Sequence, residues 1–352
     1  MDLYLKYSSI LEQNDYNKSV NIDDLQSYPL YLKIKNYIEK EKFSNILISL
    51  SGGVDSMVLL FIINHIKQHI DGLNVYCCHI NYNNRDESVD ERDFLIEYCY
   101  INNIILDVKN IEFKRSEIKR NIYEKETRQL RYNNYYDLSN KFNSNGVFLA
   151  HHKDDICENI FNNVMRGCRE ITDLTVIKER NTILNVLIHR PMLDFYKDDI
   201  LEISYHFNIP YFLDTTPDWS CRGKMRRNIF PKCADCYTDN YKNSLLKLGK
   251  ESEEVSEILN KYVIDVIMDK VTIDNQQISI PNEIILKENH ILKIIVRKLC
   301  HKYGIENMKL KCVDEFSRAL REKRLGKIKM SLLKNYSITI NIDHIYFDKV
   351  II

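Results

Sequence analysis

The sequence has 352 residues, of which 44% are hydrophobic and 28% are charged, a composition typical of globular proteins with a sizeable buried core. Only nine Gly and six Pro are present, which excludes collagen-like and low-complexity linker sequences. Fifty basic and fifty acidic residues cancel, so any nucleic-acid binding has to come from local patches. Residues 1–15 show no leader pattern, and no apolar run near the start could span a bilayer. Ten scattered cysteines form no disulfide framework, so we expect a cytoplasmic protein with no membrane contact.

Short apolar runs alternate with amphipathic segments from residue 45 onward. This pattern predicts strands over residues 45–49, 73–80, 104–111 and 147–150, and helices over residues 56–66, 89–100, 123–142 and 154–166. Such alternation is typical of an α/β fold with a parallel, doubly wound sheet. Ligands of these sheets bind outside the carboxyl ends of the strands. We therefore expect the chemistry in the loops after Ser49, Ile80 and Ala150.

The pattern changes after residue 239. It predicts helices over residues 241–269, 290–303 and 311–322, and a strand pair at the end of the chain around Asp343 and His344. We therefore predict three parts: an N-terminal extension over residues 1–44, the α/β domain over residues 45–238, and a mostly helical α+β accessory domain over residues 239–352.

The segment Ser51-Gly52-Gly53-Val54-Asp55-Ser56 follows the first predicted strand and opens a helix. Two glycines let the backbone approach an anion closely, and N–H groups at a helix N-terminus point at it. Ser51 and Ser56 can add hydroxyl donors. A carboxylate at Asp55 makes sense beside phosphates mainly when Mg²⁺ lies between them. The lysine of the GxxxxGK[ST] phosphate loop is missing.

Two pairs of charged residues lie at helical spacing in later parts of the sequence. Arg128 and Arg131 are three residues apart, so they share one helix face, which from sequence alone is more simply a solvated basic face than a phosphate site. Asp155 and Glu158 have the same spacing in the first turn of a predicted helix. Such a carboxylate pair can hold Mg²⁺, or bind an ammonium group and accept its proton. The preceding His151 and His152 leave a metal site open as an alternative, although strand geometry would splay them to opposite faces.

The segment SGGVDS resembles the pyrophosphatase loop of the N-type ATP pyrophosphatase family, whose members cleave ATP to AMP and pyrophosphate and adenylate an oxygen of their substrate. Further blocks are similar to those of one branch, the tRNA(Ile)-lysidine synthetases. They are CHINYNNR at 78–85, TRQLRY at 127–132, HHKDDICEN at 151–159, HRPML at 189–193, the stretch from Asp214 through DWSC at 218–221, and RRNIFP at 226–231. In the first of these blocks, Asn83 or Asn84 replaces the usual glycine.

This resemblance implies a Rossmann-like (HUP) fold and an ATP-dependent carbon–nitrogen ligase. Such an enzyme uses ATP and Mg²⁺, adenylates the first-anticodon cytidine of tRNA(Ile) with a CAU anticodon, and joins L-lysine to it, releasing AMP and pyrophosphate. The resemblance places tRNA recognition in the accessory domain. The oligomeric state stays open, with a homodimer as one option.

The resemblance also implies roles for individual residues. ATP binding falls to Ser51, Gly52, Gly53, Val54, Asp55, Ser56 and His79, with Asp55 also on Mg²⁺. Catalysis falls to Asp55, Arg128, Asp155 and Glu158. RNA binding falls to Arg131, Arg222, Lys224, Arg226 and Arg227, the last four in a stretch up to Lys232 that has several basic residues and no acidic one.

Two other functions stay open. A related tRNA thiolase would use sulfur as the nucleophile, and Cys221, Cys233 and Cys236 would then hold zinc or an iron–sulfur cluster. A single CxxC pair is a weak metal signal, so unliganded thiols are the simpler interpretation. A non-catalytic RNA-binding protein is the third hypothesis, against which the carboxylates around the phosphate loop argue. The basic run at residues 318–329 suits RNA phosphate and an ordinary exposed helix equally well.

Overall fold

The computed structural model describes residues 3–12, 20–83, 87–113, 119–167, 174, 177–213, 220–274 and 277–281, then residues 291, 294, 295, 298, 318 and 322 and the strands at 326–328, 336–340 and 344–349. The chain divides into two compact units, Met1–Lys250 and Glu251–Ile352. We call them the N-terminal and the C-terminal unit. The division lies somewhat beyond residue 238, where the sequence predicts the α/β domain to end.

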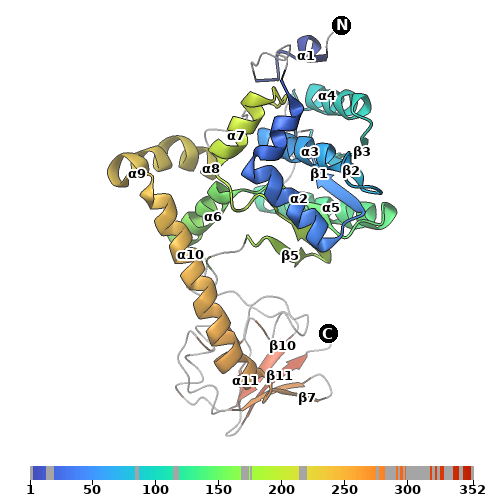
Figure 1. The fold of residues 1–352 in the computed structure, drawn as a ribbon. Helices are drawn as coiled ribbons and strands as arrows, with labels where there is room; N and C mark the ends of the chain where they lie inside the picture. The colour runs from blue at the N-terminus through green and yellow to red at the C-terminus, as the bar shows by residue number, and fades with distance from the viewer. Residues whose placement is uncertain are drawn as a thin grey trace. The chain divides into compact units, whose positions relative to one another are not determined.

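The N-terminal unit is built on a six-stranded sheet with the order β3-β2-β1-β4-β6-β5. Figure 1 shows β1, β2 and β3 next to one another. The strands are β1 Asn45–Ser49, β2 Asn74–Asn81, β3 Ile105–Asn110, β4 Val147–Phe148, β5 Arg180–Ile183 and β6 Val186–His189. All neighbours are parallel except β5 and β6, which form an antiparallel pair at one edge. The parallel sheet and its first four strands are therefore confirmed.

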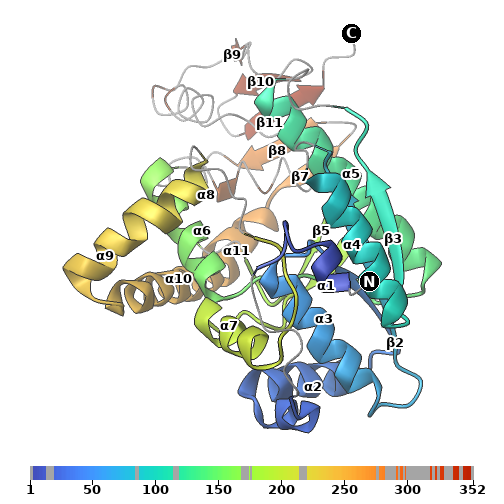
Figure 2. The same ribbon diagram turned by 90° about the horizontal axis from the view of Figure 1, so that it is seen from above.

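Helices cover both faces of this sheet. They include α2 Pro29–Glu41, α3 Val54–Lys67, α4 Ser88–Ile101, α5 Arg120–Lys141, α6 Lys153–Arg166 and α7 Lys197–His206. Ile46 and Ile48 of β1 belong to the large apolar cluster that α2, α3, α4 and α7 supply. Leu47, between them, packs instead with Tyr132, Tyr135 and Leu138 of α5. Alternate residues of a strand point to opposite faces, so α5 covers one face and α2, α3, α4 and α7 cover the opposite one. Figures 1 and 2 show α2, α3 and α7 side by side.

The residues predicted as an N-terminal extension contribute to this core. They include the short helix α1 Leu3–Lys6 and the 3₁₀ turn η1 Ile22–Ser27. Tyr31, Ile34 and Ile38 of α2 are buried in the large cluster. A bridge joins Leu11 to Phe212, and the backbone N–H of Phe212 donates to Gly52 O at 2.9 Å. The start of the chain thus braces the segment on which the Ser51–Ser56 loop rests.

Beyond α7 the N-terminal unit continues as helix. The elements are α8 Cys221–Lys224, the π-helical turn η4 Met225–Ile229, α9 Phe230–Tyr237 and the beginning of α10 Asn240–Leu259. The π-helical turn η5 Asn260–Ile264 and α11 Asp265–Met268 follow in the C-terminal unit, so the helix predicted over residues 241–269 is confirmed.

The C-terminal unit contains a five-stranded sheet with the order β7-β8-β11-β10-β9. Its strands are β7 Thr272–Asp274, β8 Gln277–Pro281, β9 Gly326–Ile328, β10 Tyr336–Ile340 and β11 His344–Lys349. β10 and β11 are antiparallel, which confirms the strand pair predicted at the end of the chain. Most of the helices predicted over residues 290–303 and 311–322, and of the basic run at 318–329, lies outside the described residues. None of the helices that the structure describes has the length and hydropathy of a membrane span.

Candidate active site

The Ser51–Ser56 loop connects the carboxyl end of β1 to α3. Its conformation is fixed by the Ser56 hydroxyl, which accepts hydrogen bonds from the backbone N–H groups of Ser51 and Gly52, both at 3.2 Å, and donates to Gly53 O at 3.0 Å. Gly52 has φ +83°, and a Cβ there would lie 1.9 Å from the ring of Phe212. Any other residue at position 52 would strain the backbone and displace the Phe212 ring. A Cβ at Gly53 would meet only Ser51 Oγ, at 3.6 Å, so that side of the loop is open to a ligand.

Asp55, in the first turn of α3, is paired with two cationic or ionisable groups from distant parts of the sequence. Its Oδ1 lies 2.6 Å from Lys197 Nζ and 3.6 Å from His152 Nε2. Lys197 is the first residue of α7, and its backbone N–H donates to Asp154 Oδ2 at 2.8 Å. Lys197 thus supplies a cation beside a phosphate loop whose motif lacks the usual lysine. We did not predict this residue from the sequence; the only signal is its position four residues after the HRPML block.

The donors around Asp55 fit Mg²⁺. This ion prefers oxygen ligands and binds through one or two carboxylates together with substrate phosphates and water. Asp55 and the hydroxyls of Ser51 and Ser56 are oxygen donors of this kind. Within the described part of the chain, no three His, Cys, Asp or Glu side chains form a metal-binding group, so a metal here would depend on the nucleotide for further ligands.

A cavity of about 280 Å³ opens beside the loop at the carboxyl ends of β1 and β2. It is lined by Ser49, Leu50, Ser51, His79, Ile80, Asn81, Tyr82, Ser88, Glu91, Arg131 and Tyr135. His79 Nδ1 is 2.9 Å from Leu50 O, and burial lowers the pKa of His79, so its imidazole is neutral near pH 7. Asn83 has φ 46° and so adopts the left-handed conformation suited to glycine. Asn84 and Arg85 lie outside the described residues.

The two arginines of α5 differ in their surroundings. Arg131 lines the cavity and donates to Tyr82 OH at 3.5 Å, but its Nε is buried without a hydrogen-bond partner among the described residues. Arg128 is exposed, with its guanidinium 4.9 Å from the centre of the Tyr132 ring. A buried donor without a partner costs free energy unless a ligand accepts from it. The geometry therefore favours Arg131 over Arg128 as a ligand contact.

The N-terminus of α6 gathers two histidines and two aspartates. His151 Nδ1 accepts a hydrogen bond from Arg190 Nε at 3.1 Å, whereas His152 faces Asp154 and Asp155 at 3.5 and 3.6 Å. Burial opposes the charged form of His152, but these carboxylates outweigh it and raise the pKa of His152. Burial, reinforced by Arg190, lowers the pKa of His151 to about 4. The two histidines thus have different partners and opposite pKa shifts.

The acid pair of α6 is buried and occupied by arginines. The side chains of Asp155 and Glu158 are only 9% and 4% exposed. Asp155 Oδ2 accepts from the His152 N–H at 3.1 Å, and its Oδ1 lies 3.4 Å from Arg222 Nη2 and 3.6 Å from Arg226 Nη2. Glu158 Oε2 lies 3.1 Å from Arg222 Nε, and Oε1 accepts a hydrogen bond from Arg226 Nε. Two residues predicted to bind RNA therefore contact two residues predicted to be catalytic.

The remaining candidates lie apart from this cluster. Lys224 and Arg227 are exposed on the same segment as Arg222 and Arg226. The stretch Asp214–Trp219, part of the DWSC block, lies outside the described residues. Cys221 lies in α8, and Cys233 and Cys236 lie in α9; all three are free thiols.

Comparisons with known proteins identify the family of this chain. Over 303 residues the chain is 26% identical to a tRNA(Ile)-lysidine synthase of Mesoplasma florum, covering 82% of this chain and 71% of the relative. It is 26% identical over 262 residues to the tRNA(Ile)-lysidine synthase of Chlamydia pneumoniae, covering 74% of this chain and 79% of the relative. The U34-tRNA thiolase NcsA from Methanococcus maripaludis, solved with its [4Fe-4S] cluster, shares the fold with a TM-score of 0.51 and 14% identity over 65% of this chain and 78% of its own. The PP-loop domain model matches residues 28–233, more than half of the chain, and the protein therefore belongs to the PP-loop family.

Proposed function

We propose that this protein is a tRNA(Ile)-lysidine synthase. It adenylates the first-anticodon cytidine of tRNA(Ile) with ATP and ligates L-lysine to that base in the cytoplasm. One observation carries the proposal: His152 Nε2 lies 3.6 Å from Asp55 Oδ1 of the phosphate loop and 3.6 Å from Asp155 Oδ2 of the acid pair. A site for the triphosphate and a site for a cationic amine thus meet at one histidine, as a two-step adenylation and ligation requires.

In the first step the C2 oxygen of the cytidine attacks the α-phosphate of ATP, and pyrophosphate leaves. The adenosine fits the cavity that His79 and Arg131 line, and the phosphates fit the open side of the Ser51–Ser56 loop at the N-terminus of α3. Lys197, whose Nζ lies 2.6 Å from Asp55 Oδ1 beside this loop, would supply a positive charge to the departing pyrophosphate. Mg²⁺, when bound, neutralises phosphate charge.

In the second step the ε-amine of lysine attacks C2. The new C–N bond forms as the bond from C2 to the oxygen of the adenylate breaks, and AMP leaves. Lysine must be neutral at the moment of attack, although its ordinary pKa is about 10.4. Asp155 and Glu158, in the first two turns of α6, bind the ammonium group and accept its proton.

Relatives of the same function, at 26% identity over most of the chain, support this assignment. The thiolase alternative lacks comparable support. Its likeness to NcsA at 14% identity extends to the fold alone, and Cys221, Cys233 and Cys236, all within the described residues, form no metal-binding group.

The test is transfer of labelled lysine to RNA. The protein is incubated with ATP, Mg²⁺, labelled lysine and a CAU-anticodon tRNA(Ile) transcript, beside a matched transcript in which uridine replaces the first anticodon cytidine. We expect ATP-dependent label on the first transcript only. AMP and pyrophosphate formation without label would assign a different nucleophile, and no AMP formation with the cognate transcript would contradict the proposal as a whole.

A further inference from the structure

The carboxylates proposed to bind lysine already hold two cations of the protein itself. Arg222 and Arg226 come from α8 and η4, more than sixty residues beyond Asp155 and Glu158 in the sequence. Each guanidinium contacts both Asp155 and Glu158. The four side chains form a cluster in which two positive charges balance two negative ones.

Every oxygen of the acid pair already faces a donor or cation of the protein, and only Glu158 Oε2, 3.1 Å from Arg222 Nε, accepts no hydrogen bond within the described residues. Asp155 Oδ2 is bound to the N-cap N–H of α6, and Asp155 Oδ1 and both oxygens of Glu158 face guanidinium nitrogens. A lysine side chain entering the cluster would meet two positive charges at a site of low exposure, where like charges repel strongly. The site can accept lysine only after the guanidinium groups withdraw.

The arginines, unlike the acids, are within reach of a large external partner. The side chains of Arg222 and Arg226 are 55% and 36% exposed, against 9% and 4% for Asp155 and Glu158. Their segment, residues 220–232, carries further basic residues and no acidic one. Guanidinium groups bind phosphates through paired hydrogen bonds, so an RNA backbone competes directly with the carboxylates for them. Arg226 also lies in a π-helical turn, an irregularity frequent at functional sites.

We infer that Arg222 and Arg226 form a latch on the lysine site, which the phosphate backbone of tRNA opens by drawing the guanidinium groups away. This inference rests on the proposed function and adds an order to it: tRNA binds first and lysine second. Because coupling between two sites is reciprocal, lysine and tRNA then raise each other's affinity by the same factor. The latch keeps the amine site closed until an acceptor RNA is present.

The experiment measures the binding of labelled lysine by equilibrium dialysis, without ATP so that no ligation occurs. Wild-type protein is compared alone and with saturating tRNA(Ile) transcript. The double variant Arg222→Gln with Arg226→Gln is measured alone, beside Lys232→Gln, which removes a positive charge from the exposed surface of α9 in the same segment. We expect tRNA to raise the lysine affinity of the wild type by about tenfold or more, the change that one charge-assisted contact is worth.

The double variant separates the latch from other kinds of coupling. With the latch removed, its lysine affinity without RNA should rise by a similar factor, while Lys232→Gln should match the wild type. An increase with tRNA but none in the double variant would place the coupling elsewhere and overturn the inference. Should the double variant fail to fold, the wild type decides alone, because equal lysine affinity with and without tRNA contradicts the latch.

The proposed function can fail separately. If lysine binds equally well in every arm and is transferred to tRNA in the ligation assay, the latch is contradicted and the proposed ligase function stands. Lysine that binds in no arm, the arm with tRNA included, overturns both.

Discussion

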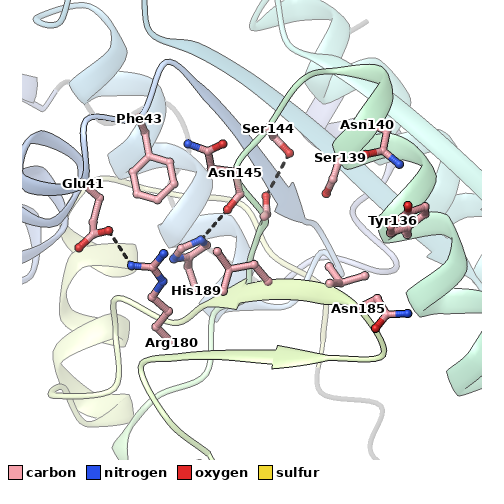
Figure 3. Close-up of a pocket in the computed structure, with 13 residues that line it drawn as sticks. Glu41, Phe43, Tyr136, Ser139, Asn140, Ser144, Asn145, Arg180, Asn185 and His189 are labelled. Carbon is pink, nitrogen blue, oxygen red and sulfur yellow. Dashed lines mark hydrogen bonds and ion pairs between the residues drawn. The ribbon is translucent and has the colours of Figure 1, made fainter.

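Two cavities at opposite ends of the same sheet differ in what their polar groups contact. The larger, about 380 Å³, lies at the amino ends of β1 and β4 and is lined by Glu41, Phe43, Tyr136, Ser139, Asn140, Ser144, Asn145, Gly146, Arg180, Asn185, Val186, Leu187 and His189 (Figure 3). There Arg180 pairs with Glu41 at 2.9 Å. Both ring nitrogens of His189 are bonded, to Tyr37 OH at 2.7 Å and to Asn145 O at 2.9 Å.

The smaller cavity, about 280 Å³, lies at the carboxyl ends of β1 and β2 beside the phosphate loop. It holds a buried guanidinium nitrogen, Arg131 Nε, without a partner among the described residues, whereas in the larger cavity the corresponding group is only a neutral hydroxyl, Ser139 Oγ. Judged by volume alone, the larger cavity would be the candidate ligand site. The smaller cavity is the better candidate, because its unpaired buried donor needs an acceptor from a ligand, and ligands of parallel sheets bind at the carboxyl ends of the strands.

The largest effect is expected from the loop carboxylate. Asp55→Ala should lower the kcat of tRNA-dependent AMP formation by about 10²–10³-fold. The variant lacks the carboxylate proposed to hold Mg²⁺, so the charge that develops on the leaving pyrophosphate is less well neutralised. Binding of tRNA should stay within a few-fold of the wild type. Glu41→Ala removes a carboxylate from the larger cavity and should leave kcat unchanged. A fully active Asp55→Ala protein would remove this residue from the mechanism.

A pair of glycines extends the comparison to the backbone. Gly52 adjoins the smaller cavity with φ +83°, and Gly146 lines the larger one with φ +123°. A Cβ at Gly146 would lie 2.4 Å from Leu187 O. Alanine at either position costs about 1–3 kcal/mol from backbone strain alone, measured as the free energy of unfolding. Only Gly52→Ala should also reduce kcat/KM for ATP, by about 100-fold, since it displaces the loop. Equal loss of ATP use in both variants would mean that fold stability, not the loop, explains the effect.

Arginine substitutions compare the two cavities directly. The resemblance assigns Arg131 to RNA, but Arg131 lines the cavity proposed for the nucleotide. Arg131→Met should therefore raise the KM for ATP by about 10–100-fold, because a charge-assisted contact to the nucleotide is lost. It should not lower the free energy of unfolding, since the wild-type group is partly unpaired. Arg180→Met breaks the ion pair with Glu41 and should leave the KM for ATP unchanged. The KM values are measured by steady-state kinetics. A raised KM for ATP in Arg180→Met together with an unchanged KM in Arg131→Met would contradict the assignment of the smaller cavity to the nucleotide.

A smaller effect concerns pH. The pKa of His151 is lowered to about 4, mainly by burial and by Arg190, against the opposing charge of Asp155. The unfolded chain binds a proton below pH 6.5 and the folded protein does not, so the free energy of unfolding falls as pH falls from 6.5 toward 4. Between pH 7 and 5 this contribution is on the order of 1–2 kcal/mol. Urea unfolding of His151→Gln should show a shallower pH dependence, and an unchanged slope would show that His151 is not its source.

Local sequence predicted much of the fold and half of the site. The strand β1, the loop from Ser51 to Ser56 and the acids of α6 follow from patterns within a few residues, because buried strands and glycine turns are locally determined. Lys197 contacts Asp55 across 142 residues of sequence, and Arg226 reaches Glu158 across 68. Such pairings depend on how helices cross the sheet edge, which composition and spacing do not determine. The assignment of Arg222 and Arg226 to RNA therefore could not anticipate that the acid pair holds them.

The most direct test of the smaller cavity as the nucleotide site is a crystal structure with Mg²⁺ and α,β-methylene ATP. In this analogue a methylene group replaces the oxygen between the α- and β-phosphorus, so the enzyme cannot release pyrophosphate. We predict the adenosine in the cavity lined by His79 and Arg131, with the β- and γ-phosphates against the loop from Ser51 to Ser56. A nucleotide in the cavity of Glu41, Arg180 and His189, with the loop empty, would contradict this assignment.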